Sequence, residues 1–340
     1  MRVFPRLLLF VTIGKTLTML GQPLHLPTPN QAIFSPGKES DYFTPTVGRT
    51  WPSGTFGCVR SEGFQMHEGL DIRCTQRDDR GEPTDPVSAA ADGKIVYINS
   101  KTGLSNYGKY IVMEHEIDQL AVYTLYAHLR KIANGLKVGQ AKKTGEIIGI
   151  LGRTSNTSQG ISRERAHLHF EVCLLANPNY LEWKRKAQPG RRNDHGLWNG
   201  QNLLGINPWN LFLKQRESQT LRMPFSLRDF IQSQPVLCRV LVPSNDLQWA
   251  ERYPELTDLS SSAEPIAAYE LLLDANGIPV RCIPRDANAI DNTDSMKLIS
   301  VDASIYKESP CRKLVFKKGQ QWVITAKGKE HLNLLTFKAN

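Results

Sequence analysis

The chain alternates short β-forming stretches with glycine-containing turns between residues 87 and 172, and this alternation limits the possible folds more than any other feature. β-Branched and aromatic residues gather in four stretches, at 87–98, 107–116, 120–129 and 167–172. Glycines recur between short apolar runs over residues 135–152, which is typical of tight β turns. Residues 117–119 have the pattern of the bend of a hairpin that joins the stretches at 107–116 and 120–129. The sequence therefore predicts a mainly β fold.

The length of 340 residues suggests about two domains. A polar, basic and glycine-rich stretch at 177–205 interrupts the first domain and predicts an exposed insertion. After residue 220, short strand-like stretches alternate with acidic and serine-rich linkers. The predicted organisation is a signal peptide over 1–21, an extended lead-in over 22–45, a first domain over 46–215 and a smaller, accessory β-rich C-terminal domain over 220–340.

The N-terminus has the pattern of a secretory signal peptide. Arg2 and Arg6 give a positive start, and an apolar run follows at residues 7–14. The run is shorter than the roughly 20 residues that span a bilayer, so no stable membrane span is expected. The alternatives are an uncleaved anchor or an ordinary buried segment. The prediction is an extracytoplasmic protein of a bacterium, in the periplasm, in the cell wall or secreted.

The formal net charge of +9 favours anionic partners, which include nucleic acid, anionic lipid and acidic cell-wall polymers. The sequence has no long block of basic residues and no basic stripe interleaved with aromatic residues. Nucleic acid is therefore not an expected partner.

Six cysteines follow the N-terminal segment, and none of them forms a CxxC pair, so a cysteine-based zinc site is not expected. An even number of cysteines in an exported chain permits disulfides, with buried free thiols as the alternative. Cys58 and Cys74 lie on predicted strands that flank a short excursion at 61–66, and strands so connected are commonly neighbours. A Cys58–Cys74 disulfide closing a loop of about 15 residues is therefore predicted.

Four of the eight histidines fall in three short segments, HEGLD at 67–71, YAHL at 126–129 and HLHFE at 167–171. His167 and His169 lie two residues apart on a predicted strand, so both imidazoles face the same side. His67 and Asp71 can share one ion only if the segment between them bends, and Gly69 permits a bend. Two histidines and one aspartate make a three-ligand set with an open position, which is typical of catalytic zinc. A further histidine beside such a site can accept and return protons.

From about residue 51 to residue 175 the chain resembles the lysostaphin-type (LytM-like) zinc endopeptidases of bacterial cell walls. The resemblance rests on SGTFGCVR at 53–60, HEGLD at 67–71, PVSAAADGKIV at 86–96, the glycine-rich stretch at 135–152 and HLHFE at 167–171. It implies a compact antiparallel β catalytic domain with a groove across the site. It also implies one Zn²⁺ per chain, bound by His67, Asp71 and His169, with His128 and His167 as the catalytic histidines.

The loop before HLHFE departs from the pattern of this family. Ser155 and Ala166 stand where family members usually carry a glycine and a proline, and Arg163 and Arg165 add positive charge. These differences concern which bond is cut rather than the chemistry of cutting.

Three further residues are candidates for substrate binding. Tyr126 lies two residues before His128, so on a regular strand it shares the face of His128. Asn106 and Tyr107 lie at a glycine-containing turn where members of the resembled family often contact substrate. Glu171 lies on the strand face of His169, where it either orients an imidazole or has a plain surface or pairing role.

The predicted function is zinc-dependent hydrolysis of peptide bonds in bacterial peptidoglycan, whose peptides are the expected partners. Two alternatives keep the same fold. One is a non-catalytic regulator of other wall hydrolases, against which the complete ligand set argues. The other is a wall-binding or structural module in which zinc only holds the fold together.

Overall fold

The computed structural model describes residues 24–339 except 158–159, 259–264, 291–294 and 312. The predicted signal peptide over 1–21 lies outside the described residues. None of the helices in the described part of the chain is both long and apolar enough to cross a membrane.

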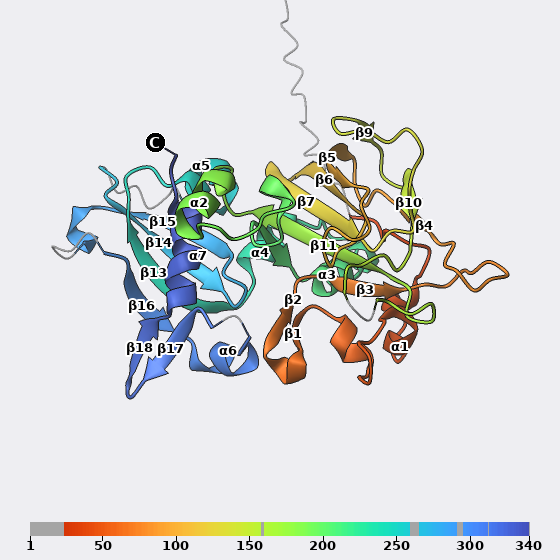
Figure 1. Cartoon of the computed structure of the whole chain (residues 1–340). Helices are drawn as coiled ribbons and strands as arrows, with labels where there is room; N and C mark the ends of the chain where they lie inside the picture. Colours follow the sequence, from red (N-terminus) through yellow and green to blue (C-terminus); the bar gives the residue numbers. More distant parts are fainter. Residues whose placement is uncertain (1–23, 158–159, 259–264, 291–294, 312, 340) are drawn as a thin grey trace, which may run out of the picture.

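A seven-stranded antiparallel sheet forms the centre of the first domain (Figure 1). Its strands follow the order β12-β11-β7-β6-β5-β9, and β3 pairs separately with β11. The strands of this sheet are β3 (Leu70–Arg73), β5 (Gly93–Asn99), β6 (Tyr110–Ile117), β7 (Leu120–Ala127), β9 (Ala141–Lys142), β11 (His167–Leu175) and β12 (Leu203–Ile206). The predicted mainly β, antiparallel fold is confirmed.

The hairpin between β6 and β7 shows how the sequence determines the sheet. Asp118 and Gln119 form its two-residue turn with φ angles of 51° and 65°, which match the twist of the flanking strands. Both faces of β7 are buried, because Val122 and Tyr126 face the main core while Leu125 faces a second cluster. The second face is continuous with the candidate site described below.

Smaller strands complete the first domain. A three-stranded sheet has the order β4-β10-β8, and a separate hairpin pairs β1 with β2. These strands are β1 (Gly57–Arg60), β2 (Gln65–His67), β4 (Pro86–Ser88), β8 (Lys131–Ile132) and β10 (Ile147–Ile150). Short 3-10 helices occur at η1 (Ala32–Phe34), η2 (Trp51–Gly54), η3 (Ser61–Gly63), η4 (Gly196–Trp198), η5 (Pro254–Leu256) and η6 (Ala287–Ala289).

The segment predicted as an extended lead-in is folded and partly helical. It contains η1 and α1 (Glu39–Tyr42), and the side chains of Tyr42 and Phe43 are fully buried. The prolines indicated an extended chain, but these aromatic side chains have enough apolar surface to draw the segment onto the core.

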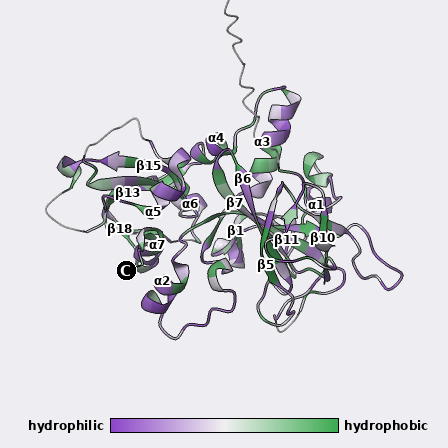
Figure 2. Cartoon of the chain, turned by 90° about the horizontal axis from the view of Figure 1, so that it is seen from above, coloured by the Kyte–Doolittle hydropathy of each residue, from purple (hydrophilic) through white to green (hydrophobic). Residues whose placement is uncertain are grey.

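The C-terminal region contains a four-stranded antiparallel sheet of order β15-β14-β13-β16 and a two-stranded hairpin. Its strands are β13 (Val236–Pro243), β14 (Ala268–Asp274), β15 (Pro279–Arg285), β16 (Lys297–Val301), β17 (Val315–Lys318) and β18 (Gln321–Ile324). The helices after α1 are α2 (Tyr180–Ala187), α3 (Pro208–Thr220), α4 (Leu227–Gln232), α5 (Gln248–Arg252), α6 (Ala303–Glu308) and α7 (Ala326–Thr336). Figure 2 shows the hydrophobic residues gathered on the strands and the outer loops mostly hydrophilic.

Buried polar contacts join the C-terminal region to the main sheet. The Asn177 side chain donates to the Leu334 carbonyl over 2.7 Å, and the Asn276 side chain donates to the Gly205 carbonyl over 2.5 Å. Arg252 donates to the Leu175 carbonyl over 2.8 Å. One continuous apolar core runs through both parts, so the C-terminal region supports the sheet edge formed by β11 and β12.

The stretch predicted as an exposed insertion contains a packed helix. Tyr180 and Trp183 of α2 are buried, and the Lys186 ammonium lies 5.3 Å from the centre of the Phe337 ring. The stretch ends where β12 joins the main sheet beside β11. This helix is amphipathic, and its basic side chains made the stretch resemble an exposed loop in the sequence.

The predicted Cys58–Cys74 disulfide is wrong, because Cys58 is bonded to Cys311, which is 253 residues away in sequence. β1 pairs with β2, whereas β3 pairs with β11, so the strands that carry Cys58 and Cys74 are not neighbours. Cys74 is buried as a free thiol, and its Sγ lies 3.1 Å from Oδ2 of Asp85. The Cys58–Cys311 disulfide therefore fastens the β1–β2 hairpin to the C-terminal region.

Replacing Cys58 and Cys311 together with serine is expected to destabilise the fold by up to about 5 kcal/mol, because the bridge closes a very long loop. Chemical unfolding monitored with and without a reductant measures the effect. The double variant should be insensitive to the reductant, and wild-type protein should be weakened by it. Equal stability of wild-type protein under both conditions contradicts the prediction.

Candidate metal centre

Three side chains from neighbouring strands converge at one point. Nε2 of His67 on β2 lies 3.1 Å from Oδ1 of Asp71 on β3 and 3.0 Å from Nδ1 of His169 on β11. Nδ1 of His169 lies 3.1 Å from Oδ1 of Asp71. The three atoms form a nearly equilateral triangle, and all three residues are buried.

Strand pairing brings the three residues together. Asp71 and His169 are direct partners in the β3–β11 ladder. The chain bends between β2 and β3 as predicted, although Gly69 is needed there for a different reason. A Cβ atom at Gly69 would lie 2.4 Å from the Phe170 carbonyl oxygen, so glycine allows close approach to β11.

Each of the three residues also has a hydrogen-bond partner outside the triangle, which fixes the orientation of its side chain. Nδ1–H of His67 donates to the Thr55 carbonyl over 2.7 Å, which leaves its Nε2 free. Nε2–H of His169 donates to Oε1 of Glu171 over 2.8 Å, so its Nδ1 is the nitrogen that faces His67 and Asp71. Arg60 donates to Oδ2 of Asp71 over 2.5 Å, so Oδ1 is the oxygen that faces the histidines. Such outer contacts are typical of metal ligands.

The donor set fits a single metal ion. A tetrahedral ion with bonds of about 2.0–2.1 Å to nitrogen or oxygen separates its ligand atoms by about 3.3 Å. The observed separations of 3.0–3.1 Å are close to this value. His67, Asp71 and His169 are therefore the residues that could hold a metal, and three protein ligands leave a position open.

Ionisation of these groups follows from their contacts. Burial opposes the charge of Asp71, but His167, His67, Arg60 and a hydrogen bond from His169 outweigh it and hold the pKa of Asp71 well below its usual range. Burial disfavours protonated His169, but hydrogen bonds to Asp71 and Glu171 raise its pKa to about 9. A metal ion needs the bare Nδ1 of His169, so its binding displaces a proton from this site.

Two further imidazoles lie beside the triangle. Nε2 of His167 is 3.5 Å from Oδ1 of Asp71, and the His128 ring centre is 4.9 Å from that of His167. Nδ1–H of His167 donates to the Arg165 carbonyl over 2.7 Å, and Nδ1–H of His128 donates to the Thr154 carbonyl over 2.9 Å. These contacts assign the proton of each neutral ring to Nδ1 and leave Nε2 able to accept one.

Both of these histidines are held neutral. Burial, with the neighbouring histidines, holds the pKa of His128 well below its usual value. Burial also lowers the pKa of His167, although Asp71 and the Arg165 carbonyl oppose this. The structure thus brings all five predicted metal and catalytic residues together, with three able to bind an ion and two able to accept protons.

The prediction that Tyr126 reaches the groove is wrong. Tyr126 is 0% exposed and belongs to the main core. Its hydroxyl accepts a hydrogen bond from the Ala90 backbone N–H over 2.8 Å. The regular alternation of side chains ends at His128, which follows β7 and has a φ angle of 61°. This left-handed conformation separates the direction of the His128 side chain from that of Tyr126.

Tyr107 and Glu171 form a buried support behind His169. The Tyr107 hydroxyl donates to Oε1 of Glu171 over 2.9 Å, on the oxygen that also accepts from His169. Glu171 therefore orients an imidazole, which is the first of its two predicted roles. The hydroxyl of Tyr107 is engaged here, so only its ring remains a candidate for contact with substrate. Asn106 lies exposed on the neighbouring turn and remains a candidate.

Replacing Glu171 with alanine is expected to weaken metal binding by about 10–100-fold, because His169 loses the acceptor that orients it. Glutamine at this position keeps an acceptor oxygen and should lose less. Competition with a chromogenic chelator measures the affinity. Glu114→Ala is the matched control, since that carboxylate pairs with Lys94 on another strand. Equal affinities of Glu171→Ala and the control contradict the prediction.

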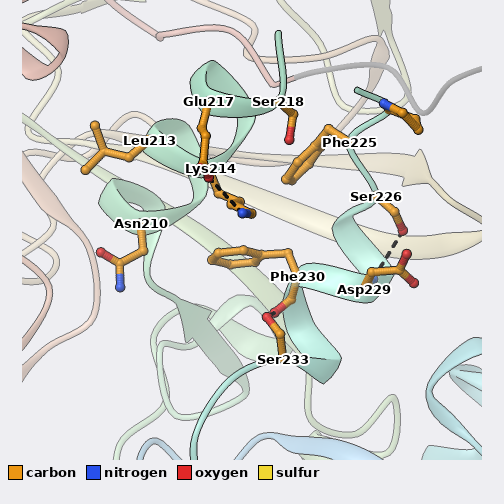
Figure 3. Close-up of a pocket in the computed structure, with 11 residues that line it drawn as sticks. Asn210, Leu213, Lys214, Glu217, Ser218, Phe225, Ser226, Asp229, Phe230 and Ser233 are labelled. Atoms are coloured by element: carbon orange, nitrogen blue, oxygen red, sulfur yellow. Dashed lines mark hydrogen bonds and ion pairs between the residues drawn. The ribbon is translucent and has the colours of Figure 1, made fainter. Parts of the chain in front are cut away.

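A cavity of about 700 Å³ lies between α3 and α4, and none of its lining residues belongs to the metal centre (Figure 3). Lys214 pairs with Glu217 over 2.7 Å, and Ser226 accepts from the Asp229 backbone over 3.1 Å. Phe225 and Phe230 contribute apolar surface to the lining.

Three side chains that could hold one metal ion, with two neutral histidines beside them, form a candidate metal centre. Residues 65–180 match the family model "Peptidase family M23". This part of the chain is similar to that peptidase family, and the matched residues include His67, Asp71, His128, His167 and His169.

Solved structures of several peptidases are similar to parts of the chain. A zinc-containing peptidase from Vibrio cholerae is 26% identical, with 45% of this chain and 33% of that chain covered and a TM-score of 0.24. The catalytic domain of the antimicrobial peptidase lysostaphin from Staphylococcus simulans is 24% identical, with 51% and 88% covered and a TM-score of 0.28. Csd3 from Helicobacter pylori is 23% identical, with 59% and 43% covered and a TM-score of 0.28. The chain thus spans about a third of the length of the Vibrio cholerae peptidase. No match was found among curated proteins.

Sequence reasoning missed Arg60 and the hydroxyl of Tyr107. Arg60 lies in SGTFGCVR, a motif that was noted without a role for its arginine. Its contact with Asp71 depends on how the β1–β2 hairpin folds over β3, which no local pattern specifies. Tyr107 was expected to contact substrate, whereas its hydroxyl donates to Glu171.

Proposed function

We propose that the protein is a zinc-dependent endopeptidase that hydrolyses peptide bonds of bacterial peptidoglycan. The observation that carries the proposal is the convergence of His67, Asp71 and His169 at 3.0–3.1 Å beside two neutral histidines. Two imidazole nitrogens and one carboxylate oxygen with an open position are typical of catalytic zinc. The match of residues 65–180 to peptidase family M23 supports peptide hydrolysis.

When bound, zinc supplies a Lewis acid that polarises the scissile carbonyl and makes water more acidic. The chain's own residues carry out the proton transfers. Nε2 of His128 and Nε2 of His167 can accept a proton from the attacking water and return it to the leaving amine. Their Nδ1–H contacts with the Thr154 and Arg165 carbonyls keep both rings in the orientation and tautomer that this requires.

The choice of peptidoglycan rests on the resemblance of residues 51–175 to the lysostaphin-type endopeptidases of bacterial cell walls, which is carried by motifs such as HEGLD at 67–71 and HLHFE at 167–171. An extracytoplasmic location is consistent with the basic and apolar N-terminal pattern of the sequence. The Cys58–Cys311 disulfide also supports it, because disulfides persist in oxidising compartments. The C-terminal region is proposed as an accessory part that helps to present the site to the wall.

Digestion of purified peptidoglycan, followed by mass analysis of the fragments, tests the proposal. New amino termini at one type of peptide bond are expected. A chelator should abolish their release, and added zinc should restore it. Intact peptidoglycan after incubation with the zinc-loaded protein would overturn the proposal, and fragments broken only in the sugar chain would do the same.

A further inference from the structure

Two arginines lie on one side of the metal centre. Arg60 from β1 donates to Oδ2 of Asp71, and the Arg165 carbonyl accepts from Nδ1–H of His167. The Arg165 side chain extends toward the N-terminal segment, where its Nε–H donates to the Pro45 carbonyl over 3.0 Å. The Arg60 side chain is 17% exposed and that of Arg165 is half-buried, so a bound molecule can approach both.

These arginines have more donors than the protein uses. A guanidinium offers five N–H donors. Arg60 bonds only through Nη2, and its Nε is buried without a partner. Among the described residues, no carboxylate pairs with Arg165. Arg163 in the same loop is different, since it pairs with Glu82 over 3.1 Å.

The charges near Arg165 are not balanced. Burial holds the pKa of Arg165 below its ordinary value, the attraction of Asp71 opposes this, and the like charge of Arg60 adds to it. Asp71 pairs with Arg60 over 2.5 Å, and it is also a proposed metal ligand. The Arg165 side of the site is therefore short of negative charge.

We propose that Arg165, with Arg60 beside it, binds a free carboxylate of the peptide substrate next to the bond that is cut. A guanidinium pairs with a carboxylate through two parallel N–H···O bonds, which give geometric specificity as well as affinity. The substrate class is then a peptide with a side-chain or terminal carboxylate near the scissile bond. This inference rests on the proposed peptidase function.

The test compares two forms of one substrate, purified peptidoglycan with its free carboxylates and the same material after conversion of those carboxylates to amides. Wild-type protein should cleave the unmodified form about ten to a hundred times faster, which is the range for one charged hydrogen-bonded contact. Arg165→Gln should bring this ratio close to one. Arg165→Lys keeps the charge but loses the Nε contact with Pro45, and it should keep part of the preference.

Arg163→Gln is the matched control, because Arg163 pairs with Glu82 outside the centre, and it should keep the wild-type ratio. If Arg165→Gln lowers both cleavage rates and leaves their ratio unchanged, Arg165 only holds its loop in place. That result would overturn the inference. A wild-type ratio close to one would also overturn it. If wild-type protein hydrolyses neither form of the peptidoglycan, the proposed function is overturned, and this inference fails with it.

Discussion

His169→Ala is expected to leave the protein without zinc and without peptidase activity. Nδ1 of His169 is one corner of the ligand triangle, at 3.0 Å from His67 and 3.1 Å from Asp71. Its loss leaves two ligands, and the effect should exceed the 10–100-fold typical of losing an outer partner. Elemental analysis of dialysed protein measures zinc per chain, for which one ion is expected in wild-type protein.

His25→Ala is the control for that experiment, since His25 is exposed and lies outside the centre. It should keep full zinc and full activity. Circular dichroism of His169→Ala shows whether the fold survives. Full zinc occupancy in a folded His169→Ala protein would remove His169 from the ligand set.

His128→Ala is expected to keep its zinc and to lose about 10²–10⁴-fold in kcat, the range for a positioned acid or base. His128 contacts the Thr154 carbonyl and the His167 ring, and it is not a corner of the triangle. Zinc content and peptidoglycan hydrolysis are measured on the same sample. A regulator or a zinc-stabilised binding module predicts no activity to lose, so this variant also separates the alternatives.

The backbone at His128 calls for a second variant. The φ angle of His128 is 61°, so alanine at this position would be strained. Asparagine tolerates this conformation better, so His128→Asn separates loss of the imidazole from a change in the loop. Near-normal turnover in His128→Asn would show that the ring does not take part in proton transfer.

Much of the sheet could be predicted because its signals are local. The β6–β7 hairpin followed from two β-forming stretches around a short polar bend, and the structure places Asp118 and Gln119 there. His167 and His169 were expected on one side because side chains on a strand alternate. Both lie at the centre, on the side of β11 that faces Asp71.

The errors arose where structure depends on distant parts of the chain or on one backbone angle. Tyr126 was expected in the groove because alternation was extended one residue too far, to His128. The partner of Cys58 could not be found locally, since Cys311 lies 253 residues away, in a turn of the C-terminal region. The same holds for Arg60, whose role appears only when the hairpin lies over β3.

The Cys58–Cys311 disulfide also imposes an order on how the protein is made. The two cysteines are 253 residues apart, and all five histidine and aspartate residues of the centre lie between them in sequence. A ribosome has therefore completed the whole ligand set long before the second cysteine exists. Until then the β1 strand, which carries the arginine that contacts Asp71, is held only by non-covalent contacts. The cysteine that is synthesised later thus fastens a strand that is made much earlier, and a chain stopped short of residue 311 has the whole ligand set but no disulfide to hold the β1–β2 hairpin.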